Sequence, residues 1–230
     1  MKKFILITFT IAASVIAEPE TPSFEPTSQF QATVIEGFTI QVNKRLYEQR
    51  KEIGSKALRQ MKAQLYVITR IVPEKQLAAL RRVPIWLDDR KDGPAQYHPD
   101  QGWLIKNNYN PDKQRSVDIS KPEHLLEEFF RQPYLLLHEL AHAYHHRELS
   151  FDDPRIIKAY KAAKKSGTYE NVLTWWQRDT RHYALTNHKE YFAETTEAYL
   201  GQNDFFPFVR AELKRHDPMG YKLMQEIWGK

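Results

Sequence analysis

The chain has 230 residues, of which 41% are hydrophobic, 27% charged and 13% aromatic, values that exclude a collagen-like or wholly disordered protein. The formal net charge of +5 is spread along the chain without a basic block, so we expect no nucleic-acid partner. The sequence has no cysteine, which excludes disulfides, thiolate metal sites and cysteine nucleophiles and leaves His, Asp and Glu as metal ligands.

Residues 1–17 have the pattern of a secretory signal peptide. Lys2 and Lys3 precede an uncharged run that ends at Ala17, and this run is shorter than the roughly 20 apolar residues of a membrane-spanning helix. We therefore expect a secreted or periplasmic protein with no stable membrane insertion after cleavage; an uncleaved N-terminal anchor is the alternative.

Residues 18–31 are rich in Pro, Ser, Thr and Glu and predict a flexible leader. Residues 32–230 contain no repeat and no further linker, which predicts a single domain.

The first part of this domain predicts strands and helices in mixed order. Residues 38–42 alternate as in a strand, residues 44–71 contain no helix breaker apart from Gly54, and a short helix follows Pro73. Short apolar runs bounded by turn residues predict three further strands, at residues 84–87, 102–105 and 116–119. After Pro122 nearly every segment has a helical pattern. Strands first and helices later predict an α+β fold.

His138, Glu139 and His142 form an H-E-x-x-H motif within a segment that contains no helix breaker. Helix residues four apart share a face and lie about 6 Å from one another, so His138 and His142 are positioned to bind one metal ion. Glu139 would lie beside the metal without binding it, as a general base for water. The Leu and Ala residues around the motif predict a buried helix, where histidines without a ligand are costly. A surface helix that carries histidines is the alternative.

Glu190, Glu194 and Glu197 share one face of a second predicted helix. Two histidines and one glutamate are a recurring catalytic zinc set, so we predict Glu190 as the third ligand of one Zn²⁺ ion. A ligating histidine usually donates its second N–H to a carboxylate or carbonyl, and both Glu194 and Glu197 are candidates for this outer position. A solvated acidic helix face is the alternative.

Four other histidines lie close to these motifs. His145 and His146 continue the first helix and compete with Glu190 as ligands, although Glu190 completes a known set. His182 and His188 flank the second motif and are candidates for assisting catalysis. A di-iron centre needs two Glu-x-x-His pairs, and the sequence has only one.

Tyr183 lies seven residues before Glu190, which opens the string E-Y-F-A-E. Together with H-E-L-A-H, this order and spacing resemble the catalytic domain of the anthrax lethal factor type of gluzincin metallopeptidases. The resemblance covers about residues 120–200 and implies a zincin-like fold, with His138, His142 and Glu190 as zinc ligands. It further implies Glu139 as general base and Tyr183 as the hydroxyl that stabilises the oxyanion. The large binding domains of the toxin have no counterpart here, so its targets are not carried over.

These features predict a secreted, monomeric zinc metallopeptidase that acts on a peptide or protein substrate. In zincins, a strand that precedes the active-site helix binds extended peptide at the sheet edge, and residues 102–105 and 116–119 are the candidates for this strand. Two alternatives are a non-catalytic zinc-binding module of the same fold and a zinc amidase that acts on a cell-wall peptide. The presence of both Glu139 and Tyr183 favours the peptidase.

Overall fold

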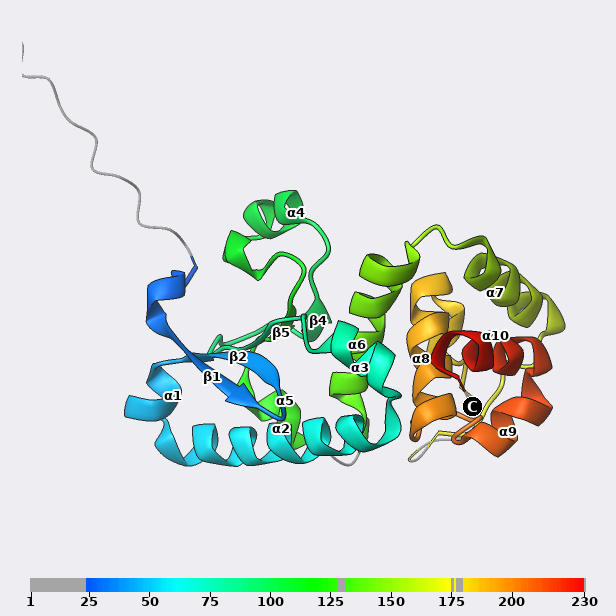
Figure 1. Cartoon of the computed structure of the whole chain (residues 1–230), viewed down its shortest axis with the longest axis horizontal. Helices are drawn as coiled ribbons and strands as arrows, with labels where there is room; N and C mark the ends of the chain where they lie inside the picture. The colour runs from blue at the N-terminus through cyan, green and yellow to red at the C-terminus, as the bar shows by residue number, and fades with distance from the viewer. Residues whose placement is uncertain (1–23, 128–130, 175, 177–179, 230) are drawn as a thin grey trace, which may run out of the picture.

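The computed structural model describes residues 24–127, 131–174, 176 and 180–229, and it contains a five-stranded mixed sheet (Figure 1). The strands lie in the order β1-β2-β3-β5-β4, antiparallel at both ends of the sheet and parallel across β2, β3 and β5. The predicted α+β class is confirmed, and β4 is a terminal strand that pairs on one side only among the described residues. The strands are β1 (Phe30–Ile35), β2 (Phe38–Asn43), β3 (Ile85–Leu87), β4 (Ala95–Tyr97) and β5 (Val117–Ile119).

The first half of the chain also supplies helices that pack against the sheet. The longest of them, α2, lies along the sheet and buries one side in the core (Figure 1). The helix predicted over residues 44–71 is divided into α1 and α2, which pack closely where a Cβ atom on Gly54 would clash with the carbonyl of Leu46. The helices are α1 (Arg45–Glu48), α2 (Lys51–Ile71), α3 (Glu74–Leu80), α4 (Gln101–Lys106) and α5 (Pro122–Glu127), with single turns η1 (Thr27–Gln29) and η2 (Pro111–Lys113).

Residues 102–105 form part of helix α4, so the strand predicted there is wrong. A carboxylate oxygen of Asp100 accepts the backbone N–H of Trp103 at 2.6 Å and so caps the start of this helix. A four-residue apolar run fits a strand and a buried helix equally well, which explains the error. Strand β4, in contrast, lies in a segment for which no strand was predicted.

Strand β1 begins at Phe30, so the last two residues of the predicted leader belong to the sheet. The Phe30 ring is buried and packs edge-on against Trp86, with ring centroids 4.8 Å apart. The predicted signal peptide and residues 18–23 lie outside the described residues. Within the described part of the chain, no helix is both long and apolar enough to span a membrane.

The second half of the described chain is mainly helical, as predicted. Helix α6 carries the H-E-x-x-H motif, continues into a π-helical turn, and lies between the sheet and the C-terminal helices (Figure 1). The described residues between 167 and 187 depart from the helical prediction, with an isolated bridge between Val172 and Thr180 and one turn of 3-10 helix. The elements are α6 (Leu135–Tyr144), η3 (His145–Leu149), α7 (Pro154–Ser166), η4 (Tyr183–Leu185), α8 (His188–Leu200), α9 (Arg210–His216) and α10 (Pro218–Trp228).

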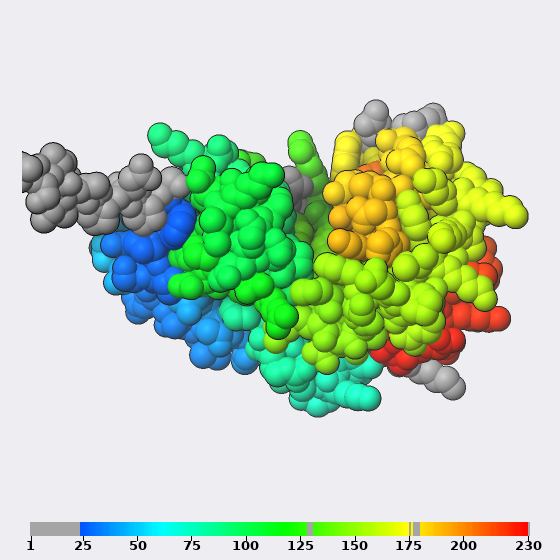
Figure 2. Space-filling view, turned by 90° about the horizontal axis from the view of Figure 1, so that it is seen from above, coloured from blue at the N-terminus to red at the C-terminus, as the bar shows by residue number. Residues whose placement is uncertain are grey.

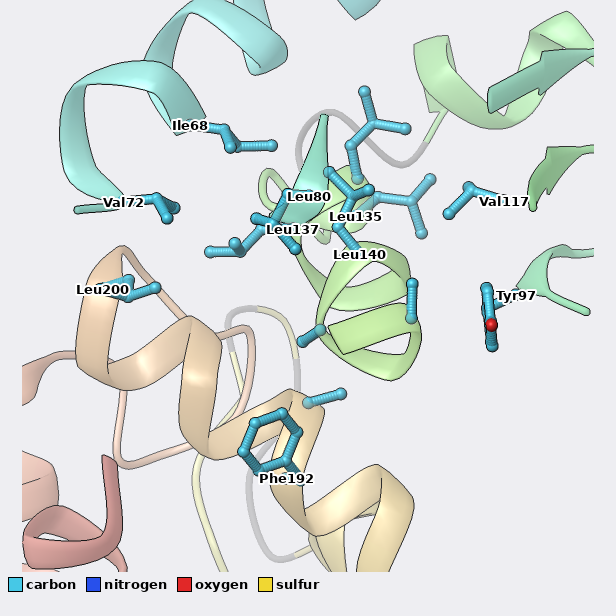
Figure 3. Packing of buried hydrophobic residues seen from close by; sticks show 14 of the residues in the cluster. Ile68, Val72, Leu80, Tyr97, Val117, Leu135, Leu137, Leu140, Phe192 and Leu200 are labelled. Atoms are coloured by element: carbon cyan, nitrogen blue, oxygen red, sulfur yellow. The ribbon is translucent and has the colours of Figure 1, made fainter. Parts of the chain in front are cut away.

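Helix α6 is buried on nearly all sides. Figure 3 shows Leu135, Leu137 and Leu140 between residues of the first half, such as Ile68, and Phe192 of helix α8. These side chains belong to a single hydrophobic cluster that joins the sheet to the C-terminal helices. The histidines of α6 are therefore held on an element that is packed from both sides.

A buried ion pair connects the segment between β4 and β5 to the sheet. The Lys113 Nζ atom lies 2.5 Å from Oδ2 of Asp88 and 2.8 Å from Oδ1 of Asp118. Each of these three side chains is at most 3% exposed. Burial alone would raise the pKa of Asp118, but the charge of Lys113 and a hydrogen bond from His98 hold that pKa below its usual value. This segment therefore depends on a lysine that is fully removed from water.

Candidate metal centre

Three predicted ligands converge on one point. Nε2 of His138 lies 3.1 Å from Nε2 of His142, and each nitrogen lies 3.2 Å from Oε2 of Glu190. The histidines are one turn apart on α6, while Glu190 lies in the first turn of the neighbouring helix α8. The side chain of Asn187 fixes the start of α8, since its oxygen accepts the backbone N–H groups of Lys189 and Glu190.

This arrangement of donors fits a zinc ion. In a tetrahedral site with bonds of about 2.0–2.1 Å, the donors lie about 3.3–3.4 Å apart, close to the separations seen here. Burial alone would raise the pKa of Glu190, but hydrogen bonds from His138 and His142 lower it well below its usual value, so the carboxylate is ionised. Glu190 and Glu197 raise the pKa of His138 far above the usual value despite its burial. The centre therefore favours a bound cation, either a proton or a metal.

The other ring nitrogen of His138 meets a carboxylate, as the sequence predicts. Its Nδ1 lies 2.6 Å from Oε1 of Glu197 and 3.6 Å from Oε1 of Glu194. Glu197, which also accepts a hydrogen bond from Gln132, is therefore the direct partner. Glu194 is buried and lines the cleft; burial, together with the negative charge of Asp204, raises its pKa well above the usual value.

Glu139 and Tyr183 lie at the same centre. Glu139 is 6% exposed and lines the cleft together with Tyr97 of β4. Burial raises the pKa of Glu139, as is suitable for a group that takes up and releases a proton. The Tyr183 side chain is 47% exposed and lines the cleft, and burial together with the charge of Glu190 raises its pKa.

The cleft above these residues has a volume of about 600 Å³. It is lined by the β4 segment on one side and by residues of α6 and α8 on the other, and Figure 2 shows a hollow between the green and the orange-yellow parts of the chain. Neither segment proposed from the sequence forms the strand at this cleft. Residues 102–105 are helical, while β5, within residues 116–119, lies inside the sheet between β3 and β4. No strand was predicted at β4, because a three-residue strand within the four residues between Pro94 and Pro99 gives almost no periodic pattern.

The remaining histidines have other surroundings. His145 is fully buried against Phe151 and Phe192, and burial lowers its pKa to about 3. His146 forms a 2.8 Å hydrogen bond with the Tyr97 hydroxyl. His182 accepts the backbone N–H of Ala184, and His188 donates to the carbonyl of Phe151. Among the described residues, none of these four histidines belongs to a group of donors close enough to hold a metal.

Comparison with protein-family models, curated proteins and solved structures found no match to this chain. Any function proposed for it therefore depends on the chemistry of the cleft. The cleft combines three donors that could hold a metal ion, a buried carboxylate and a phenol.

Proposed function

We propose that the protein is a secreted zinc metallopeptidase of the gluzincin kind, with a zincin-like fold. The observation that carries this proposal is the convergence of His138, His142 and Glu190 at the floor of the cleft, with Glu139 beside them. Two His and one Glu are a recurring ligand set of catalytic zinc, which leaves a coordination position for water or substrate. The N-terminal pattern of two lysines and an uncharged run supports secretion.

Each residue of the centre has a defined task in amide hydrolysis. His138, His142 and Glu190 would hold the zinc ion, which would supply Lewis acidity for activating water and polarising the substrate carbonyl. Glu139 takes a proton from the water molecule as the water oxygen adds to the carbonyl carbon, and then transfers that proton to the leaving amine nitrogen. Tyr183 donates a hydrogen bond to the developing oxyanion, an interaction worth about 3 kcal/mol for one well-placed donor.

The open edge of β4 supports a peptide as the substrate. The backbone groups of Gln96 and His98 face β5, since Gln96 pairs with Asp118 and His98 N–H donates to the carbonyl of Ser116. In an antiparallel pair the intervening residues, here Ala95 and Tyr97, direct their backbone groups to the other side, which is the cleft. An extended peptide can therefore bind by adding a strand to this edge.

The test is mass spectrometry of a diverse peptide mixture incubated with the zinc-loaded mature chain, residues 18–230. We expect cleavage that disappears after chelation and in Glu139→Gln. Glu148→Gln is a matched control, because Glu148 is an exposed acid just beyond the same helix. We expect this control variant to cleave as the unmodified protein does. Absence of cleavage by a folded, zinc-bound protein would contradict the proposal and favour a non-catalytic zinc-binding module.

A further inference from the structure

A second cavity, which we call the side pocket, adjoins the cleft at the C-terminal end of β4. Its volume is about 310 Å³, and its lining residues are Gln96, Tyr97, His98, Pro99, Asp100 and Trp103. Gln96, Tyr97 and Pro99 also line the cleft, so the two cavities are neighbours along the same strand. A peptide bound along β4 would thus pass the mouth of the side pocket.

Trp103 gives the side pocket a fixed aromatic wall. The indole is 43% exposed, although its ring packs against His98 and Tyr109 with centroid distances of 5.5 and 5.4 Å. Both supporting rings are buried, and the helix cap from Asp100 fixes the backbone at Trp103. An exposed tryptophan that is held in place in a concave site offers a large apolar contact at little cost in side-chain entropy.

Gln96 adds an unused hydrogen-bond donor between the two cavities. Its amide nitrogen is buried and, within the described part of the chain, has no hydrogen-bond partner. A buried donor without an acceptor is unfavourable, and Gln96 lines both the cleft and the side pocket. A peptide carbonyl would reach this donor only after the Gln96 side chain turns toward the cleft, so the donor is not a ready-made contact in this conformation.

The position of the side pocket relative to Glu139 indicates which part of a peptide it receives. Tyr97 lies beside the general base, because Tyr97 and Glu139 line the same cleft. The side pocket extends from Tyr97 toward Pro99 and Trp103. A peptide that pairs antiparallel with β4 runs in the opposite direction to the strand, so its N-terminal part lies at Pro99. In this antiparallel arrangement, the pocket is reached by residues that precede the scissile bond.

We propose that the side pocket is a specificity subsite for an aromatic or large aliphatic side chain on the N-terminal side of the scissile bond. This inference rests on the proposed peptidase function and specifies its substrate class. The indole of Trp103 and the ring of Pro99 supply apolar contact, while the carboxylate of Asp100 disfavours an acidic side chain. An apolar pocket discriminates between a large and a small side chain through the surface that each one buries.

The test compares paired peptides that carry Phe or Ala at each of the three positions before the scissile bond. We expect the unmodified zinc-loaded protein to prefer Phe in kcat/KM at one of these positions by at least roughly tenfold. Trp103→Ala should remove most of this preference, and Trp103→Phe should restore part of it. Ile105→Ala is the matched control, since Ile105 is exposed on the same helix and does not line the side pocket. Thermal unfolding of each variant shows whether it is folded.

The possible outcomes distinguish the subsite from the peptidase function. Cleavage with no preference before the scissile bond, or a preference that persists in folded Trp103→Ala, overturns the subsite and leaves the peptidase function intact. If no peptide is cleaved, the peptidase function fails, and binding of the same fluorescently labelled peptides to Glu139→Gln then tests the pocket. Tighter binding of the Phe peptide that depends on Trp103 would support the pocket, and its absence would refute it.

Discussion

Nδ1 of His138 lies 2.6 Å from Oε1 of Glu197, two turns beyond the candidate ligand Glu190 on the same helix. This contact fixes the orientation of the imidazole whose other nitrogen faces the metal position. It also links α6 to α8 at the point where the candidate ligands from the two helices meet. A side chain outside the His138, His142 and Glu190 group therefore helps to determine the geometry of the centre.

Replacing Glu197 should weaken metal binding. We expect Glu197→Gln to reduce zinc affinity by about 10–100-fold, because loss of an outer carboxylate partner lowers the basicity and order of the ligand. The effect should exceed that of Glu194→Gln, since Glu194 lies 3.6 Å from the same nitrogen. Titration with a competing chelator measures both affinities, and Glu226→Gln, an exposed acid on α10, is the control. An equal or larger effect at Glu194 would reverse the assignment.

Removal of the Tyr183 hydroxyl should slow the reaction without changing metal content. We expect Tyr183→Phe to lower kcat by about 10²–10³-fold with little change in KM, because the lost hydrogen bond acts mainly in the transition state. The measurement is steady-state kinetics on a peptide found in the cleavage screen. Tyr66→Phe is the control, since Tyr66 is an exposed tyrosine on α2. A rise in KM at constant kcat would indicate that Tyr183 binds the ground state instead.

His145 should make the protein less stable in acid. Burial lowers its folded pKa to about 3, so the unfolded chain binds more protons between about pH 6.5 and pH 3. The stability contributed by neutral His145 is complete above that range and is lost as the pH falls. Each pH unit costs about 1.4 kcal/mol for one such group. His145→Phe keeps the ring packing against Phe151 and Phe192 and removes the ionisation.

The measurement is urea denaturation of the chelated protein at pH 7.5 and pH 5. Between these two pH values, His145→Phe should lose roughly 2 kcal/mol less stability than the unmodified protein. His182, whose pKa is also lowered to about 3 by burial, should continue to destabilise both proteins in acid. Identical pH dependence of the two proteins would show that His145 does not contribute.

Lys113 should be essential to the stability of the sheet. Lys113→Met leaves Asp88 and Asp118 buried without their common counterion, which typically costs 3–5 kcal/mol, so we expect a loss of about this size. Lys106→Met, at an exposed lysine on α4, should change the free energy of unfolding by no more than about 0.5 kcal/mol. Urea denaturation at neutral pH measures both values. A loss at Lys113 as small as that at Lys106 would mean that the two aspartates find other partners.

Helical periodicity made much of the candidate centre predictable. His138 and His142 are one turn apart in a segment without breakers, and an uninterrupted pattern of this length fixes which side chains share a face. The same reasoning placed Glu190 on a second helix, where Asn187 provides the cap. A local pattern was sufficient in each case because the hydrogen bonds of a helix connect residues that are close in sequence.

The short strands were much harder to predict from the sequence than the helices. Strand β4 has three residues, and it becomes a strand only by pairing with β5, which lies beyond helix α4 in the sequence. Residues 102–105 have an apolar run of similar length and form a helix instead, because Asp100 caps it. The hydrogen bonds of a sheet join distant segments, so the sequence close to a strand does not specify its partner or its place at an edge.

The sequence by itself determined the identity of the candidate ligands and their spacing on two helices, because both follow from the period of the α-helix. It left Glu194 and Glu197 equivalent, since both lie on the face of α8 that carries Glu190. Only the tertiary structure decided between them, because the packing of α6 against α8 brings Glu197 closest to His138. The tertiary structure also decided that β4 forms one wall of the cleft and that Trp103 lies beside the C-terminal end of β4. Both features depend on contacts between segments that are separate in the chain.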